Sequence, residues 1–237
     1  MTSRPAVLSI AGLDPSGGAG ILADIKTFEQ HKVQGFGVCT ALTYQTENKF
    51  LGLDWLSNKQ LLDQFAPLFE QYDIKAVKIG LIQHAQLKFT LNHLPKNIPI
   101  IWDPVLNASA GFDFENELDF NTIQEILPFI TLITPNLEEY ASLELGNIKS
   151  TNVLLKGGHH NENKNDRLIL TNGETHEIIG EKFTKAFNKH GTGCILSSAI
   201  ASNLALGCTL EQACILAKKY VENILKSNDG LLAYHTN

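Results

Sequence analysis

A glycine-rich turn at residues 189–194, with the sequence Lys-His-Gly-Thr-Gly-Cys, holds the residue types in this chain that are best suited to chemistry. It directly precedes an apolar run that is typical of a helix. The start of a helix carries partial positive charge and unpaired N–H groups, so the amides of Gly191, Thr192 and Gly193 could hold a phosphate. Cys194 would lie on the first turn, where the same field should lower the pKa of its thiol. The turn therefore predicts phosphoryl transfer, with a simple helix cap as the structural alternative.

A second glycine loop follows the first apolar run of the chain. Residues 6–11 predict a buried strand that ends at Gly12, and residues 21–30 predict an amphipathic helix, with Asp14 and three more glycines between Gly12 and the helix. The loop lacks the lysine of a P-loop and the spacing of a dinucleotide-binding loop. Because α/β sheets bind ligands at the carboxyl ends of their strands, this loop either contacts a ligand or serves only as a turn.

Polar residues also come at or just after the ends of four later apolar strands. They are Lys78 with Gly80, Asp103, Asn136 and Lys156. Parallel strands bring these ends to one edge of a sheet, so we expect the residues to meet there. Each has a structural explanation when taken singly, since Asp103 could cap a turn and Asn136 could cap a helix.

Strands and helices alternate along most of the chain, which predicts a mostly parallel sheet with helices on both faces. Residues at about 36–56 predict two strands around a polar tip, a small flap that projects from the sheet. Asn172 and Gly173 predict the turn of an antiparallel hairpin. We expect a single domain over residues 1–237.

Composition excludes several classes of function. A formal charge of −6 over 237 residues argues against a nucleic-acid-binding surface. The four cysteines have no metal-ligand spacing and are expected to be reduced thiols. The apolar runs are far shorter than a membrane span. We therefore expect a soluble cytoplasmic protein with no nucleic-acid or membrane partner.

Six motifs occur in order along the chain. They are Ala-Gly-Leu-Asp-Pro-Ser-Gly-Gly-Ala-Gly-Ile at 11–21, Lys-Ile-Gly at 78–80, Asp-Pro-Val at 103–105, Thr-Pro-Asn-Leu-Glu-Glu at 134–139, Lys-Gly-Gly-His at 156–159 and His-Gly-Thr-Gly-Cys at 190–194. Together they resemble the hydroxymethylpyrimidine/phosphomethylpyrimidine kinases of thiamine biosynthesis, which belong to the ribokinase-like superfamily. The resemblance covers roughly residues 5–225. It implies a three-layer α/β sandwich.

The resemblance also implies an ATP- and Mg²⁺-dependent kinase, acting as a homodimer on 4-amino-5-hydroxymethyl-2-methylpyrimidine and on its monophosphate. Residues implied to act at the substrate hydroxyl and the transferring phosphoryl group are Cys194, Gly191, Thr192 and Gly193. Residues implied to bind Mg²⁺ or phosphates are Asp103, Asn136, Glu139 and Lys156. Residues implied to bind the pyrimidine are Gln45, Gly12, Asp24 and Gly80.

The chain departs from the family pattern at two points. Only residues 145–152 separate the Asn-x-x-Glu helix from the next strand, where the family has a further helical segment, and Leu81 stands where relatives commonly have Met. The first departure bears on the nucleotide side of the site. The second conserves side-chain volume and should be tolerated.

Several functions stay open at this point. The nearest alternative is a pyridoxal or pyridoxine kinase of the same superfamily. A cysteine hydrolase would need a histidine base, for which His190 is poorly placed and His159 is a candidate. A protein that binds a pyrimidine or nucleotide without turnover would not need a metal clamp. Within a kinase, Cys194 either accepts the hydroxyl proton late or only shapes the pocket.

Overall fold

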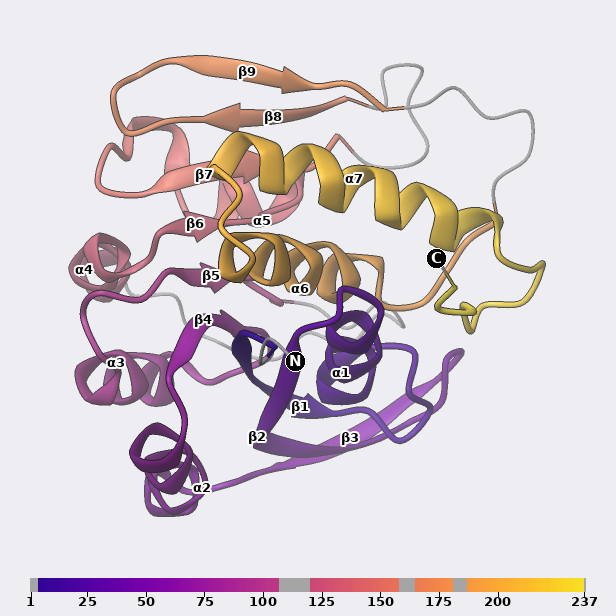
Figure 1. The fold of residues 1–237 in the computed structure, drawn as a ribbon. Coiled ribbons are helices and arrows are strands. Elements are labelled where there is room, and N and C mark those ends of the chain that lie inside the picture. The colour runs from indigo at the N-terminus through magenta and orange to yellow at the C-terminus, as the bar shows by residue number, and fades with distance from the viewer. Residues whose placement is uncertain (1–3, 107–119, 158–164, 181–186, 237) are drawn as a thin grey trace.

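A nine-stranded sheet is the centre of the fold in the computed structural model, which describes residues 4–106, 120–157, 165–180 and 187–236. The strand order is β3-β2-β1-β4-β5-β6-β7-β8-β9 (Figure 1). The strands are β1 (Ala6–Leu13), β2 (Gln34–Gln45), β3 (Phe50–Trp55), β4 (Ile74–Ile79), β5 (Ile100–Trp102), β6 (Leu132–Ile133), β7 (Asn152–Leu155), β8 (Asp166–Ile169) and β9 (Thr175–Ile178). The six strands from β2 to β7 in this order are parallel, and β3, β8 and β9 each pair antiparallel with a neighbour. The predicted mostly parallel sheet is confirmed.

Helices cover both faces of the sheet and complete the predicted three-layer sandwich. One face carries α1 (Gly20–Gln30), α6 (Thr192–Ala205) and α7 (Leu210–Lys226). The other carries α2 (Asn58–Gln71), α3 (His84–His93), α4 (Phe120–Ile126), the 3₁₀ turn η1 (Leu127–Phe129) and α5 (Leu137–Ser142). Figure 1 shows α6 and α7 crossing in front of the sheet. None of the helices in the described ranges is both long and apolar enough to cross a membrane.

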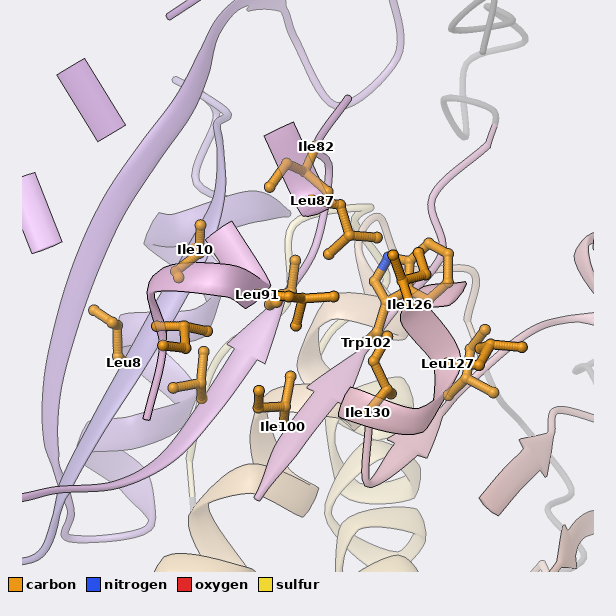
Figure 2. Packing of buried hydrophobic residues seen from close by; sticks show 14 of the residues in the cluster. Leu8, Ile10, Ile82, Leu87, Leu91, Ile100, Trp102, Ile126, Leu127 and Ile130 are labelled. Atoms are coloured by element: carbon orange, nitrogen blue, oxygen red, sulfur yellow. The ribbon is translucent and has the colours of Figure 1, made fainter. Parts of the chain in front are cut away.

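Alternating side chains of the central strands pack into two separate hydrophobic clusters, one on each face of the sheet. In β1, Leu8 and Ile10 face the cluster under α2 and α3, whereas Val7 faces the cluster under α1 and α6. Figure 2 shows the first cluster, with Leu91 of α3 lying among side chains of the sheet such as Ile100. Both faces of these strands are buried, which explains why they are nearly continuous apolar runs in the sequence.

The predicted flap is the end of a long hairpin at the edge of the main sheet, and its two strands are β2 and β3. The first part of β2 pairs in parallel with β1, from Gln34 to Leu42. Only its last part, from Ala41 to Gln45, pairs with β3. The parallel part is anchored because the side chain of Val38 is fully buried in the core. The hairpin at Asn172 and Gly173 joins β8 to β9, as predicted.

The connection from α5 to β7 is as short as the sequence predicts. It contains the 3₁₀ turn η2 (Leu145–Asn147) and no further helix. Leu143 and Leu145 are buried and close the core at this point. Helix α5 ends at Ser142, and Glu144 just after it adopts a left-handed conformation with φ of 50°.

Hydrogen bonds continue the parallel ladder beyond the ends of the strands, and this positions the polar residues. The N–H groups of Gly80, Asp103 and Lys156 donate to carbonyls of the preceding strand or turn at 2.9, 2.8 and 2.9 Å. The acceptor for Lys156 is Pro135, the neighbour of Asn136. The prediction that these residues meet at one edge of the sheet is confirmed for Asp103, Asn136 and Lys156, whereas the side chain of Lys78 is fully buried beneath that edge.

Candidate active site

The glycine turn before α6 packs tightly against the first glycine loop. Gly191 caps the helix with φ of 77° and ψ of 19°, a left-handed conformation that favours glycine. A Cβ atom at this position would lie 2.0 Å from the carbonyl oxygen of Gly18 and 2.8 Å from Cα of Ala19. A side chain therefore cannot be placed at Gly191 without separating the two loops.

The N-terminus of α6 presents a row of free backbone donors. The first hydrogen bond of the helix runs from the N–H of Ile195 to the carbonyl of Gly191, at 3.0 Å. The N–H groups of the predicted residues Gly191, Thr192 and Gly193, and that of Cys194, precede it and have no acceptor within the described ranges. All four residues line a cavity, so their amides and the partial positive charge of the helix are available to an anion there.

The cavity has a volume of about 430 Å³ and follows the edge of the sheet formed by the strand ends. Toward β2 and β3 its walls include Gly12, Thr43, Gln45, Phe50, Leu81 and Val105. Its centre includes Asp103, Asn136, Glu139, Lys156 and the start of α6. Toward β8 and α7 its walls include Asp166, Leu196, Lys218 and Val221.

Asp103 and Lys156 lie directly opposite the start of α6. The Nζ atom of Lys156 donates to Oδ1 of Asp103 at 3.1 Å. A Cβ atom at Gly193 would lie 3.3 Å from Oδ2 of Asp103 and 3.4 Å from Nζ of Lys156. The glycine thus lets the helix amides approach both charged groups.

Lys156 also interacts with Glu139, whose Oε2 lies 3.6 Å from Nζ. Burial alone would lower the pKa of Lys156, but the charges of Asp103 and Glu139 raise it above its ordinary value. Burial raises the pKa of Glu139, and the charge of Lys156 offsets this only in part. Two carboxylates therefore share one ammonium group, and a further cation would stabilise their charged forms.

Asn136 and Glu139 form a capping box at the start of α5. The N–H of Glu139 donates to Oδ1 of Asn136 at 2.8 Å, and the N–H of Asn136 donates to Oε2 of Glu139 at 2.7 Å. The structural interpretation of this motif is therefore correct. Both side chains nevertheless line the cavity, so capping fixes their positions without removing them from it.

The predicted low pKa of Cys194 is wrong. Burial raises the pKa of the thiol to about 11, even though the charge of Lys78 acts in the opposite direction. The carboxylates of Asp24 and Asp103 raise it further. Cys194 is therefore a neutral thiol near pH 7 and cannot act as a proton acceptor in that state.

Asp24 and Gly80 are not among the residues that line the cavity. Asp24 is fully buried, and its two carboxylate oxygens lie 3.0 and 2.9 Å from Nζ of Lys78. The hydroxyls of Ser9 and Ser198 donate to the same carboxylate at 2.5 and 2.6 Å. A Cβ atom at Gly80 would lie 2.7 Å from Nζ of Lys78. These residues support the site from below, which corrects the expectation that Asp24 and Gly80 line it.

Gln45 lines the cavity as predicted, and its hydrogen bonds fix the orientation of its amide. Thr43 donates its single hydroxyl hydrogen to the carbonyl of Leu13 at 2.9 Å. Toward Gln45 the hydroxyl can therefore only accept, so the Nε2 group of Gln45 faces it at 2.9 Å. The Oε1 atom of Gln45 remains as an acceptor for a ligand that carries an N–H or O–H group.

Asp14 links the two glycine loops, a role that the sequence did not reveal. Its carboxylate accepts from the N–H of Ser16, the N–H of Ala19 and Nε2 of His190, at 2.8, 2.9 and 2.9 Å. Burial alone would raise the pKa of Asp14, but these hydrogen bonds hold it below its ordinary value. An Asp followed by Pro and Ser signals a local turn, whereas nothing in the sequence signals the bond to His190.

The hydrolase alternative loses its support in this geometry. His190 bonds to Asp14, and no histidine in the described ranges is hydrogen-bonded to Cys194. His159, the other candidate base, lies outside the described residues, as does Gly158 of the same motif.

Asp166 and Lys218 also belong to the cavity wall and were not predicted. Oδ2 of Asp166 lies 3.0 Å from Nζ of Lys218, and Oδ1 accepts from the N–H of Gly157 at 2.8 Å. The two charged residues are far apart in the sequence, and Asp166 looks like an ordinary hairpin residue there. Only the tertiary structure brings them to the site.

The oxygen atoms of Asp103, Asn136 and Glu139 suit Mg²⁺, which prefers hard oxygen ligands. The described residues contain no group of three or more His, Cys, Asp or Glu side chains that could enclose a metal ion. A Mg²⁺ ion at this edge would therefore also need water or phosphate oxygens, as is usual for Mg²⁺ with nucleotides.

Comparisons with known proteins agree with this geometry. A family model described as phosphomethylpyrimidine kinase matches residues 14–236. A hydroxymethylpyrimidine/phosphomethylpyrimidine kinase of Rhizobium meliloti is 34% identical over 247 residues, which cover 94% of this chain and 91% of that protein. A protein of the same description from Saccharomyces cerevisiae is 34% identical over 92% of this chain, but the chain spans only 45% of its length.

Two solved structures are also similar. A phosphomethylpyrimidine kinase from Clostridium difficile aligns with a TM-score of 0.76 and 30% identity, over 93% of this chain and 99% of that one. A pyridoxal kinase from Staphylococcus aureus in complex with pyridoxal aligns with a TM-score of 0.81 and 25% identity, over 98% of this chain and 92% of that one. Backbone similarity therefore does not separate the two kinds of kinase, and the side chains of the cavity must do so.

The raised pKa of Cys194 has a measurable consequence. Alkylation of Cys194 by iodoacetamide, followed at that site by mass spectrometry, should keep accelerating through pH 10, because the thiolate is the reactive form and the pKa is about 11. The reaction of glutathione in the same solution should level off just above the ordinary pKa of a cysteine thiol, about 8.5. A plateau for Cys194 at or below the pH of the glutathione plateau would contradict the neutral thiol.

Proposed function

Because the chain belongs to the phosphomethylpyrimidine kinase family, we propose that it transfers the γ-phosphoryl group of ATP to 4-amino-5-hydroxymethyl-2-methylpyrimidine. The acceptor is the hydroxymethyl oxygen. We further propose that the monophosphate of this alcohol is a second acceptor at the same site. The observation that carries the proposal is the position of the free amides of α6, which face Asp103 and Lys156 in one cavity.

In phosphoryl transfer the main tasks of the protein are to position the reactants and to stabilise charge. The N–H groups of Gly191, Thr192 and Gly193, together with that of Cys194, would hold the equatorial oxygens of the migrating group. Lys156 would neutralise phosphate oxygens as a point charge. Loss of one such backbone donor typically raises the barrier by about 3 kcal/mol, so these amides are the largest contribution that the chain itself offers.

Asp103, Glu139 and Asn136 would hold Mg²⁺ together with phosphate oxygens and water. When bound, Mg²⁺ would neutralise charge that develops on the phosphates. The carboxylates of Asp103 and Glu139 already compete for one ammonium group, which supports the presence of a further cation.

We assign Cys194 to positioning the acceptor hydroxyl rather than to removing its proton. Its thiol is neutral near pH 7, since burial raises its pKa to about 11. In a loose transition state the hydroxyl proton leaves late, so a strong base is not required. This favours the interpretation in which the thiol shapes the pocket.

Gln45 favours an aminopyrimidine over pyridoxal as the acceptor. Its Nε2 group is committed to Thr43, and its Oε1 atom can only accept a hydrogen bond. The exocyclic amino group of the pyrimidine, next to its hydroxymethyl group, is a donor that fits this atom, whereas the substituent in the same position of pyridoxal is an aldehyde, which can only accept. Pyridoxal kinase therefore stays the second candidate, supported by the shared fold.

The predictions of a homodimer and of a cytoplasmic location remain proposals. Leu42, Tyr44 and Leu51 of β2 and β3 are exposed apolar side chains at the edge of the sheet. They offer a surface on which a second copy could pack.

The proposed function is tested by coupled measurement of ADP release across ring alcohols. We expect release that depends on Mg²⁺ and on 4-amino-5-hydroxymethyl-2-methylpyrimidine, with at least about tenfold lower kcat/KM for pyridoxal, because a site that hydrogen-bonds its substrate discriminates by this order or more against an analogue that lacks the donor. A preference for pyridoxal would transfer the assignment to the second candidate. Absence of ADP release with every alcohol would refute the kinase.

The role of Gln45 is tested by Gln45→Leu with two substrates, the aminopyrimidine and its analogue lacking the amino group. We expect kcat/KM for the aminopyrimidine to fall about tenfold, the order expected for one lost hydrogen bond, and kcat/KM for the analogue to change less than about twofold. Gln34→Leu, at an exposed position of the same strand, is the matched control. An equal loss on both substrates would show that Gln45 does not read the amino group.

A further inference from the structure

The chain folds back after α7 and contacts the segment that leads into α6 (Figure 1). The Nζ atom of Lys189 donates to the carbonyl of Asn228 at 2.5 Å, to Oδ1 of Asn228 at 2.7 Å and to the carbonyl of Gly230 at 2.5 Å. An ammonium group has three donors, and here all three meet oxygens of the tail. Lys189 is therefore occupied by the tail and does not serve as a free cation.

Asn228 also folds the tail into a compact loop. Its Oδ1 accepts from the N–H of Gly230 at 2.9 Å, and its Nδ2 donates to the carbonyl of Leu232 at 3.0 Å. One side chain thus shapes the loop and presents its oxygens to Lys189. Lys189 is only 9% exposed, so these neutral oxygens replace the water that its ammonium group would otherwise bind.

The same loop holds the backbone next to the phosphoryl-binding turn. The N–H of His190 donates to the carbonyl of Leu231 at 3.0 Å. A methyl group of Leu232 lies 2.9 Å from the position that a Cβ atom would take at Gly18. Gly18 in turn abuts Gly191, the cap of α6. The tail, the first glycine loop and the turn before α6 therefore contact one another around His190.

We propose that residues 228–232, here called the tail clamp, are a positioning element of the phosphoryl-binding turn. Gly191 has no side chain to fix its direction, so its neighbours Lys189 and His190 must do so, and both are held by the tail clamp. A displacement of about 1 Å at reacting groups can reduce a rate on the order of 100-fold. The tail clamp therefore acts on turnover without touching a substrate.

The test compares Asn228→Ala, Lys189→Met and their combination, with Asn223→Ala on the exposed face of α7 as the matched control. This part rests on the proposed kinase activity. We expect each single variant to lower kcat about tenfold, which is less than the loss expected when the reacting groups are displaced by a full ~1 Å. The KM for the pyrimidine alcohol should change less than about twofold. The double variant should lose about as much as the more damaging single one, because both changes act on the same contact between Lys189 and the tail. Asn228→Asp keeps the oxygen that Lys189 binds and should recover most of kcat.

A second measurement does not depend on the reaction. Amide hydrogen exchange of the peptide containing residues 189–195 should accelerate in Asn228→Ala and Lys189→Met but stay unchanged in Asn223→Ala. Unchanged exchange in folded variants overturns the tail clamp, even if the wild-type protein proves to have no kinase activity. An active wild-type protein whose kcat survives both substitutions also overturns it. If Asn228→Ala fails to fold, the kcat and the amide exchange of Lys189→Met and Asn228→Asp test the tail clamp instead.

Discussion

The close approach of the α6 N-terminus to the strand ends is the constraint on which the rest of the site depends. A Cβ atom at Gly193 would lie 3.3 Å from Asp103 and 3.4 Å from Lys156. Free helix donors, a carboxylate and an ammonium group are thereby brought to one point of the cavity. Such an arrangement concentrates charge stabilisation where a phosphoryl group can pass, and it costs no reorganisation when the reaction occurs.

Buried ion pairs support this approach from beneath the cavity. Asp24 and Lys78 are fully buried, and their carboxylate and ammonium groups lie within 3.0 Å of each other. Taking two charges from water is costly, and such pairs often contribute little net stability. Hydroxyls from β1 and α6 complete the hydrogen bonds of the carboxylate, so the pair ties these elements to α1 and β4. We interpret this network as a device for fixing geometry at the start of α6.

Much of the fold could be predicted because local patterns determine it. Apolar runs gave the strands, and polar residues after them marked the edge where Asp103 and Lys156 meet. The pKa of Cys194 could not be predicted, since helix position suggested one direction and burial, which depends on tertiary packing, imposed the other. The pairing of Asp166 with Lys218 was equally hidden, because nothing in the sequence links residues so far apart. The residues with reactive or charged side chains could thus be predicted from the sequence, whereas the residues they contact could be identified only from the structure.

The most direct test of the account adds one methyl group, in the variant Gly193→Ala. Alanine is a better helix former than glycine by about 1 kcal/mol in a helix interior, which offsets part of the cost of the new contacts, so the protein should still fold. The new methyl group would lie against Asp103 and Lys156, where the proposed reaction places the migrating group. The account predicts that ATP-dependent phosphorylation of the pyrimidine alcohol falls on the order of 100-fold. If turnover stayed within about threefold of the wild-type value, the account would be contradicted.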